Sequence, residues 1–271
     1  MSFSLPRPGK TILGTILVVV GIWVIYAISF NWGEFGEGPL GLLLGSTPDL
    51  FRGQIWRLVT APFVHFTRGG AGVSHLLTTL MVLYFFGPTL EDRWGPRRLI
   101  LFMVGSGAFA FLLQAIIAYF IPKLDGGITI APGMRIGPGV WFGGLGVIEA
   151  LAVAWALASR GQTVRLYFLI PITGTMLLIF IFAMSVLNVL ALAEKFEGLV
   201  TPFGGMLAGY LFGDVSPLRR VWLKLRLKQI QRETAALRKQ PPKSRAAGTL
   251  RVIKGGADDD DKPPKDKKYL N

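Results

Sequence analysis

The chain has 271 residues, of which 51% are hydrophobic and only 17% are charged, and its mean hydropathy is +0.49. This composition excludes an ordinary soluble domain and indicates an integral membrane protein. With no cysteine and two histidines, the chain has no disulfide, thiolate nucleophile or His-rich metal centre, and no metal or other cofactor is expected. Residues 216–271 account for +10 of the net charge of +13, with 16 Lys+Arg against 6 Asp+Glu. The basic excess is therefore a property of the tail and does not indicate nucleic acid.

Six apolar stretches are predicted to cross the membrane as helices, since a crossing takes about 20 residues. They are residues 11–30, 75–90, 99–121, 139–159, 166–192 and 199–213. With six spans, both termini lie on the same side of the membrane, and the connections on that side are richer in arginine and lysine than those on the other side. The positive-inside rule therefore predicts that both termini are cytoplasmic. We expect an all-α polytopic fold, with a six-helix membrane domain over residues 1–215 and a basic cytoplasmic tail over residues 216–271.

The first loop, residues 31–74, is too apolar for a solvated loop and too broken for a span. It is predicted to be partly embedded in the membrane, with Trp32, Trp56 and Phe66 near the lipid headgroups and its arginines reaching out to them. An ordinary extracytoplasmic loop is the alternative.

The fourth and sixth stretches contain closely spaced glycines, which let helix backbones approach each other where burying apolar side chains gains little. We interpret residues 139–159 as one buried helix that begins with almost bare backbone and packs on the sixth span. The glycines are Gly143, Gly144, Gly146, Gly205, Gly209 and Gly213.

Glu149 follows the first glycine cluster, and a carboxylate inside a span is costly and usually faces a cavity or a partner. Contact with a bound protein or proton-linked gating is one interpretation. A buried carboxyl group satisfied within the fold is the other, with Asn188 of the fifth stretch as its candidate partner.

The tail begins with a basic segment in which apolar residues are interleaved, partly with period two, so its helical pattern is imperfect. These residues are Val221, Leu223, Leu225, Leu227 and Ile230. The segment is predicted to lie against anionic lipid headgroups, and a solubilising tail is the alternative. After residue 240 the composition is typical of disorder.

Four motifs, between about Phe51 and Gly213, resemble the rhomboid superfamily of intramembrane serine proteases in order and spacing. QIWRLVTAPFVH contains a Trp-Arg pair, Trp56–Arg57, like that of the family's first loop. HLLTTLMVLYFFGPTLEDRWGPRR resembles the second span and the following turn, GGLGVIEAL the fourth-span GxSG motif, and GGMLAGYLFG the sixth-span glycine ladder. The matching residues of the second motif are His75, Gly87, Glu91, Arg93 and Gly95.

The residues that would carry the chemistry depart from the family pattern. Leu145 stands where the GxSG serine nucleophile is expected, and Pro202 stands where the general-base histidine is expected. On the oxyanion side His75 remains, but Thr79 replaces an asparagine. Leucine has no lone pair to activate and proline has no titratable group, so acyl transfer lacks both reacting groups.

The resemblance therefore implies a pseudoprotease, and the family's non-catalytic members bind transmembrane client proteins and control their folding, trafficking or degradation. Trp56, Arg57 and Glu149 are the candidate client- or lipid-contact residues. For Trp56 and Arg57, anchoring of the first loop is the favoured alternative. A bacterial plasma (inner) membrane is the simplest location for so compact a form.

Two other functions remain open. An active peptidase with a rewired site would need a new nucleophile, for which Ser74, Ser106 and Ser185 are the candidates, the last paired with a carboxylate. A small transporter or channel would use Glu149 and Asn188, although transporters usually show internal repeats and this chain has none.

Overall fold

The computed structural model describes residues 7–31, 39–67, 69–124, 128–131, 134–136, 139–159, 163–166, 170–191, 197–214 and 216–239. Trp32 and the tail after residue 239, for which disorder is predicted, lie outside the described residues. The chain divides into two units, Met1–Leu223 and Lys224–Asn271.

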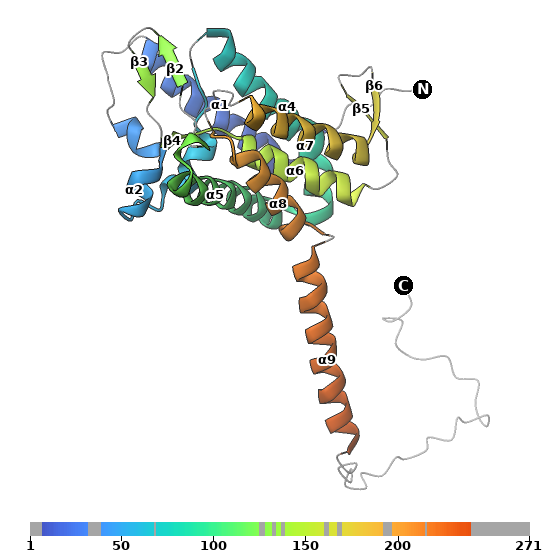
Figure 1. The fold of residues 1–271 in the computed structure, drawn as a ribbon. Coiled ribbons are helices and arrows are strands. Elements are labelled where there is room, and N and C mark those ends of the chain that lie inside the picture. Colours follow the sequence, from blue (N-terminus) through green and yellow to red (C-terminus); the bar gives the residue numbers. More distant parts are fainter. Residues whose placement is uncertain are drawn as a thin grey trace, which may run out of the picture. The chain divides into compact units, whose positions relative to one another are not determined.

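Helices dominate the first unit (Figure 1). The α-helices are α1 (Lys10–Asn31), α2 (Thr47–Phe51), α3 (Arg57–Thr60), α4 (Gly69–Trp94), α5 (Pro96–Phe120), α6 (Leu145–Ala158), α7 (Gly174–Leu190), α8 (Thr201–Phe212) and α9 (Pro217–Lys239). Short 3-10 helices are η1 (Pro39–Leu43), η2 (Ala61–Phe63) and η3 (Pro122–Leu124).

The described residues are mostly helical, as expected, and the structure adds short antiparallel strand pairs between the helices. The pairs are β1 (Gly45–Ser46) with β4 (Val140–Trp141), β2 (Ile128–Ala131) with β3 (Met134–Ile136), and β5 (Thr163–Leu166) with β6 (Ile170–Thr173).

Three helices in the described part of the chain are long and apolar enough to cross a membrane, namely α1, α4 and α5. The apolar helices α6 and α7 are shorter, with 14 and 17 residues. At 1.5 Å per residue α6 extends only about 21 Å, less than the thickness of the hydrocarbon core, so it lies within the bundle and covers part of the depth.

The fourth predicted span begins too early in the sequence-based interpretation. Residues 139–144 are not helical, because Gly139 and Gly143 have φ angles of 95° and 128°, which a right-handed helix cannot contain. Gly144 is the N-cap, and α6 starts at Leu145. The two first glycines of the cluster therefore form the approach to the helix and are not its first turns.

The fifth predicted span also begins too early. Residues 163–166 and 170–173 are rich in β-branched residues and pair as β5 and β6. Helix α7 begins only at Gly174, after the Thr173 side chain has accepted a hydrogen bond from the Met176 backbone N–H.

Helices α4 and α5 meet at a tight turn. The charged residues after the second predicted span continue α4 to Trp94, and Gly95, with φ of 76°, reverses the chain before α5 begins at Pro96. The Glu91 carboxylate of α4 accepts hydrogen bonds from the backbone N–H groups of Thr11 and Ile12, and so caps the first turn of α1.

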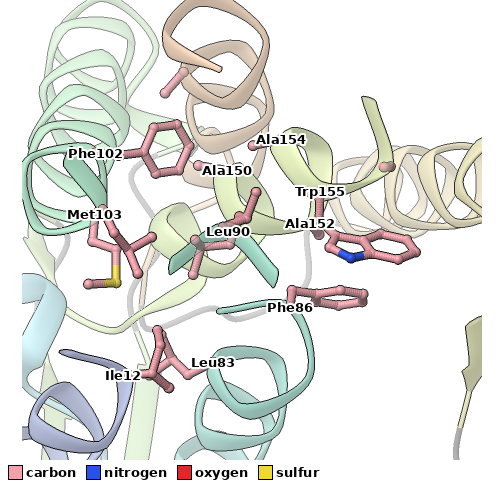
Figure 2. Packing of buried hydrophobic residues seen from close by; sticks show 14 of the residues in the cluster. Ile12, Leu83, Phe86, Leu90, Phe102, Met103, Ala150, Ala152, Ala154 and Trp155 are labelled. Atoms are coloured by element: carbon pink, nitrogen blue, oxygen red, sulfur yellow. The ribbon is translucent and has the colours of Figure 1, made fainter. Parts of the chain in front are cut away.

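Helix α6 lies among α4, α5, α7 and α8 (Figure 1) and supplies the centre of the core. Figure 2 shows Trp155 of α6 beside Phe86 of α4, and the same buried cluster contains the alanines of α6, Phe102 of α5 and Ile12 of α1. Because α6 is rich in alanine, its backbone comes close to its neighbours on several sides.

The closest approach is between α6 and α8. A Cβ atom placed on Gly205 would lie 3.0 Å from the Gly146 carbonyl carbon, and one placed on Gly209 would lie 2.6 Å from the Ala150 carbonyl oxygen. Neither position has room for a side chain, so these glycines set the distance between the two helices.

Helix α9 is continuous from Pro217 to Lys239 despite its imperfect pattern. Basic residues and exposed apolar residues alternate around it. The exposed apolar residues are Val221, Trp222, Leu223, Leu225, Leu227 and Ile230.

We expect Gly205→Ala to lower the free energy of unfolding by about 1–3 kcal/mol, because the added methyl group would meet backbone atoms that cannot move aside. Unfolding of the purified protein in detergent micelles measures the effect. The matched control is Gly105→Ala in α5, where a Cβ atom meets nothing within 4 Å and helix propensity favours alanine by roughly 0.5–1 kcal/mol. Equal effects of the two changes would contradict the packing role of Gly205.

Candidate functional site

Four polar side chains gather at the start of α6, and we call them the buried polar cluster: His65, Thr79, His75 and Glu197. His75 Nε2 lies 2.5 Å from Glu197 Oε1, and His65 Nε2 lies 3.0 Å from Thr79 Oγ1. The two imidazole rings lie 4.9 Å apart between centroids. The cluster joins the first loop, α4 and the segment before α8.

The hydrogen bonds of His65 define its protonation. Its Nδ1 lies 3.2 Å from the Phe63 carbonyl oxygen and must donate to it, which leaves Nε2 to accept from the Thr79 hydroxyl. Burial, and next the neighbouring His75, lower the pKa of His65 to about 4. His65 is therefore neutral at physiological pH.

Glu197 is 3% exposed, and a carboxylate so deeply buried needs a partner. Burial alone would raise the pKa of its carboxyl group, but the charge and the hydrogen bond of His75 outweigh burial and hold this pKa below its ordinary value. Glu197 is therefore ionised, accepts from His75 Nε2, and ties the segment before α8 to α4.

Glycines make room for the cluster. A Cβ atom on Gly143 would lie 2.7 Å from the Glu197 Cγ and Cδ atoms, and one on Gly144 would lie 3.2 Å from His65 Nε2. Gly143 and Gly144 therefore do not pack on the sixth span as expected, but line the cluster from the α6 side.

A glutamine from α5 holds the beginning of α8. Gln114 is fully buried, and its side-chain oxygen accepts from the backbone N–H groups of Val200 and Thr201 at 2.7 and 3.2 Å. Its nitrogen donates to the Leu124 carbonyl oxygen at 2.8 Å. The first N–H groups of a helix otherwise lack partners, so Gln114 replaces an ordinary N-cap.

Leu145 and Pro202 stand at the starts of neighbouring helices. Leu145 is the first residue of α6 and is partly exposed, and Pro202 is the second residue of α8 and is buried. Proline fits the first turn of a helix because its missing N–H would have no partner there. Neither side chain is a nucleophile or a base.

Thr79 and His65 have the relation of a hydroxyl group and an adjacent base, but the surroundings oppose acyl transfer. Both side chains are buried, and the low pKa of His65 makes it a weak base. A cavity that borders Thr79 and Gly144 has a volume of about 70 Å³, which is too small for a peptide segment.

Glu149 lies one turn after Leu145, away from the cluster. Its Oε2 atom is buried and has no hydrogen-bond partner among the described residues. Ser185, considered as its partner in a rewired site, donates its hydroxyl to the Ile181 carbonyl oxygen instead. No hydrogen bond joins Glu149 to Asn188 in the described part of the chain.

The Trp56–Arg57 pair divides into an exposed and a buried residue. Arg57 is 6% exposed, donates to the carbonyl oxygens of Gly41 and Leu44, and pairs with Asp49 Oδ2 at 3.3 Å. The Arg57 guanidinium therefore bonds to groups of the first loop itself, as the loop-anchoring interpretation expects of it. Trp56 is 47% exposed and donates to the Leu42 carbonyl oxygen.

Sequence reasoning missed His65 and Glu197. No spacing in the sequence marks Glu197 as a partner of a histidine 122 residues earlier in the chain. The one local signal near Glu197 in the sequence is the glycine that follows it. Gly198 has a φ angle of 81°, which ends any helix continuing from the fifth span before α8 begins.

The Rhomboid domain model matches residues 52–217, which is more than half of the chain. The chain belongs to the rhomboid family. Its family membership and apolar helices indicate an integral membrane protein.

Several rhomboid-family relatives are similar to this chain at low identity. RHOMBOID-like protein 12, mitochondrial, of Arabidopsis thaliana is 25% identical over 66% of this chain and 50% of the relative. Rhomboid-like protease 2 of Toxoplasma gondii is 26% identical over 65% of this chain and 54% of the relative. Inactive RHOMBOID-like protein 8 of Arabidopsis thaliana is 30% identical over 38% of this chain and 25% of the relative.

The chain spans about half or less of the length of these rhomboid relatives. One relative is named a protease and another is named inactive, so membership of the rhomboid family does not decide whether a member cleaves peptides.

We expect the protein to lose stability as the pH falls from about 6.5 to about 4, and His65→Gln to remove this part of the loss. In that window an unfolded His65 binds a proton and the native one does not, so acid favours unfolding, by up to about 1.4 kcal/mol per pH unit. Glutamine keeps an amide that can hydrogen-bond Thr79 but does not titrate. Unfolding midpoints in micelles at pH 7, 5.5 and 4 provide the measurement, and parallel pH profiles of the two proteins would contradict the assignment.

Proposed function

We propose that this rhomboid-family protein is catalytically inactive and binds transmembrane segments of client proteins within the bilayer. The observation that carries the proposal is the pair of residues at the beginnings of α6 and α8. Leu145 and Pro202 occupy the positions at which the family resemblance expects the nucleophile and the general base. A peptidase of this type needs an activatable oxygen and a base within hydrogen-bond reach of it.

The buried polar cluster supports the proposal because it closes the region in which a peptide bond would have to lie. The bond between His75 and Glu197 joins α4 to the segment before α8. The family resemblance implies that His75 would help to bind the oxyanion of a reaction intermediate, but here its Nε2 proton already has the Glu197 carboxylate as acceptor. An oxyanion would have to compete with a full negative charge for that proton.

Glu149 supports client binding. A carboxylate at this depth is costly unless it faces a cavity or a partner, and its Oε2 atom has no partner among the described residues. Leu145 lies one helical turn earlier and is partly exposed. A client helix that brings a hydroxyl, amide or basic side chain to this level would satisfy Glu149 and cover Leu145.

The side of the bundle formed by α7 is a fitting place for such a helix. α7 carries many exposed apolar residues, while its Gly174 lies against α6, where a Cβ atom would be 2.9 Å from the Ala156 carbonyl oxygen. The exposed apolar residues are Met176, Ile179, Phe180, Phe182, Met184, Leu187 and Leu190.

We place the protein in a bacterial plasma membrane, with six spans and both termini in the cytoplasm, from its compact form and charge pattern.

We expect the purified protein in lipid to cleave no model transmembrane substrate and to take no label from a fluorophosphonate probe. The double change Leu145→Ser with Pro202→His is also expected to give no efficient cleavage, because Thr79 replaces the oxyanion-side asparagine and Glu197 remains bonded to His75. An active rhomboid protease in the same lipid is the positive control.

Labelling of any residue would overturn the inactive assignment, and mass spectrometry of the labelled peptide would identify the nucleophile. Label on Thr79 would show that His65 activates its hydroxyl. Efficient cleavage by the double variant would show that the rest of the site is still competent.

We expect a photo-crosslinking amino acid at Leu145 to capture single-pass membrane proteins in cells, and Glu149→Leu to reduce this capture about fivefold or more, since an interhelical hydrogen bond in a membrane contributes about 1–2 kcal/mol. The yield of crosslinked protein by mass spectrometry is the measurement.

The matched control carries the crosslinker at Leu101, which is 73% exposed and lies on α5, a different helix from that of Glu149. Capture of the same proteins with equal yield at Leu145 and Leu101 would contradict a client site beside Glu149.

A further inference from the structure

Three arginines share one carboxylate where α4, α5, α8 and the beginning of α9 meet. Asp214 lies 2.7 Å from Arg93 Nε, 3.0 Å from an Arg98 nitrogen and 2.9 Å from an Arg219 nitrogen. Trp94 Nε1 also donates to it at 2.8 Å. Although partial burial acts in the opposite direction, the Trp94 hydrogen bond and the arginines lower the pKa of Asp214, so it stays ionised. One negative charge thus faces three positive charges.

The arginines retain donors for another anion. A guanidinium has five N–H donors, and Arg98 and Arg219 each direct one nitrogen to Asp214. Among the described residues, Asp214 is the carboxylate bonded to these two side chains. Arg98 also lies over the Trp94 ring, with its Cζ atom 4.7 Å from the ring centroid, a cation–π contact that helps to hold the guanidinium in place.

A surface groove of about 340 Å³ lies beside these arginines. Arg98 and Arg219 form its charged part, and Leu211, Phe212 and Trp222 form its apolar part. All of these residues belong to the first unit of the chain. The groove therefore offers positive charge and apolar surface to the same ligand.

The neighbourhood of the groove favours a lipid over a soluble anion. Next to Arg98 along α5, Leu101 is 73% exposed, and on α8 Leu207 and Phe212 are each 41% exposed. These residues lie on helices of the membrane domain, where exposed apolar side chains face acyl chains. A tryptophan and arginines at a helix end are typical of the headgroup region. Inorganic phosphate has no part that would use the apolar wall.

We propose that this groove binds an anionic phospholipid, with its phosphate on Arg98 and Arg219 and the beginning of an acyl chain on Leu211, Phe212 and Trp222. The site goes beyond client binding, and it gives the expected attraction of the basic tail to anionic lipid a defined place at the start of α9. Charge-assisted hydrogen bonds from two guanidinium groups provide affinity for the phosphate, and its excess negative charge selects anionic over zwitterionic lipid.

The test is lipid binding by the full chain, measured by native mass spectrometry from detergent micelles with phosphatidylglycerol, phosphatidylcholine or inorganic phosphate added. We expect phosphatidylglycerol to bind more tightly than phosphatidylcholine. The double variant Arg98→Gln with Arg219→Gln should weaken phosphatidylglycerol binding about tenfold or more, as expected when two basic contacts of about 1 kcal/mol each are lost.

The matched control is Arg97→Gln with Arg220→Gln, which removes the same charge from the adjacent, exposed positions outside the groove. Equal weakening by the two double variants would overturn the site in favour of general surface attraction. Equal affinity for the two lipids, or displacement of phosphatidylglycerol by millimolar inorganic phosphate, would also overturn it.

Because Arg98 and Arg219 also hold Asp214, the thermal unfolding of each variant is measured without lipid. Trp222→Ala leaves the Asp214 pairs in place and is expected to weaken phosphatidylglycerol binding about threefold through the loss of apolar contact. If the arginine variant is unfolded, unchanged binding by Trp222→Ala overturns the proposal.

Discussion

The membrane domain depends on the close backbone contact between α6 and α8. In a bilayer apolar side chains gain little from leaving lipid for protein, so helices associate where their backbones can touch. Gly205 and Gly209 present bare backbone to Gly146 and Ala150, and nothing larger than hydrogen fits between them. Because Gly146 follows Leu145 directly and Gly205 is three residues after Pro202, the contact also fixes how the two helix starts face each other. The architecture is thus maintained by packing and does not require catalytic side chains at these starts.

Two carboxylates inside the bundle show opposite solutions to the same energetic problem. Glu197 is paired with His75 at 2.5 Å, and its charge is satisfied within the chain. Glu149 has a buried oxygen without a partner among the described residues. A satisfied ion pair makes the region that it joins more rigid. An unpaired buried carboxyl group would instead gain free energy from hydrogen-bonding a partner that arrives later. The division agrees with a protein that has one closed region and one receptive region.

The sequence predicts much of the helical framework and little of the polar cluster. Hydrophobic length reveals α1, α5 and α8, and glycine spacing reveals the contact between α6 and α8, because both signals lie within one segment. The positive φ of Gly143 is invisible in an apolar pattern, so residues 139–144 were interpreted as helix. The pairing of His75 with Glu197 depends on how distant segments meet, and no local pattern encodes it. Arg57 was found by resemblance, but its burial depends on carbonyl groups of the folded first loop.

The cap on α1 has a consequence for biosynthesis. The backbone N–H groups at the start of α1 are satisfied by Glu91, which follows Thr11 by 80 residues. When α1 leaves the ribosome, its partner has not been translated, and the first helix must wait in the membrane with its leading amides in contact with water or headgroups. Docking of α1 can be completed only after α4 has been inserted to its last turn. Membrane insertion of α1 and its docking against α4 are therefore separate events, because the docked state requires Glu91 to be in place.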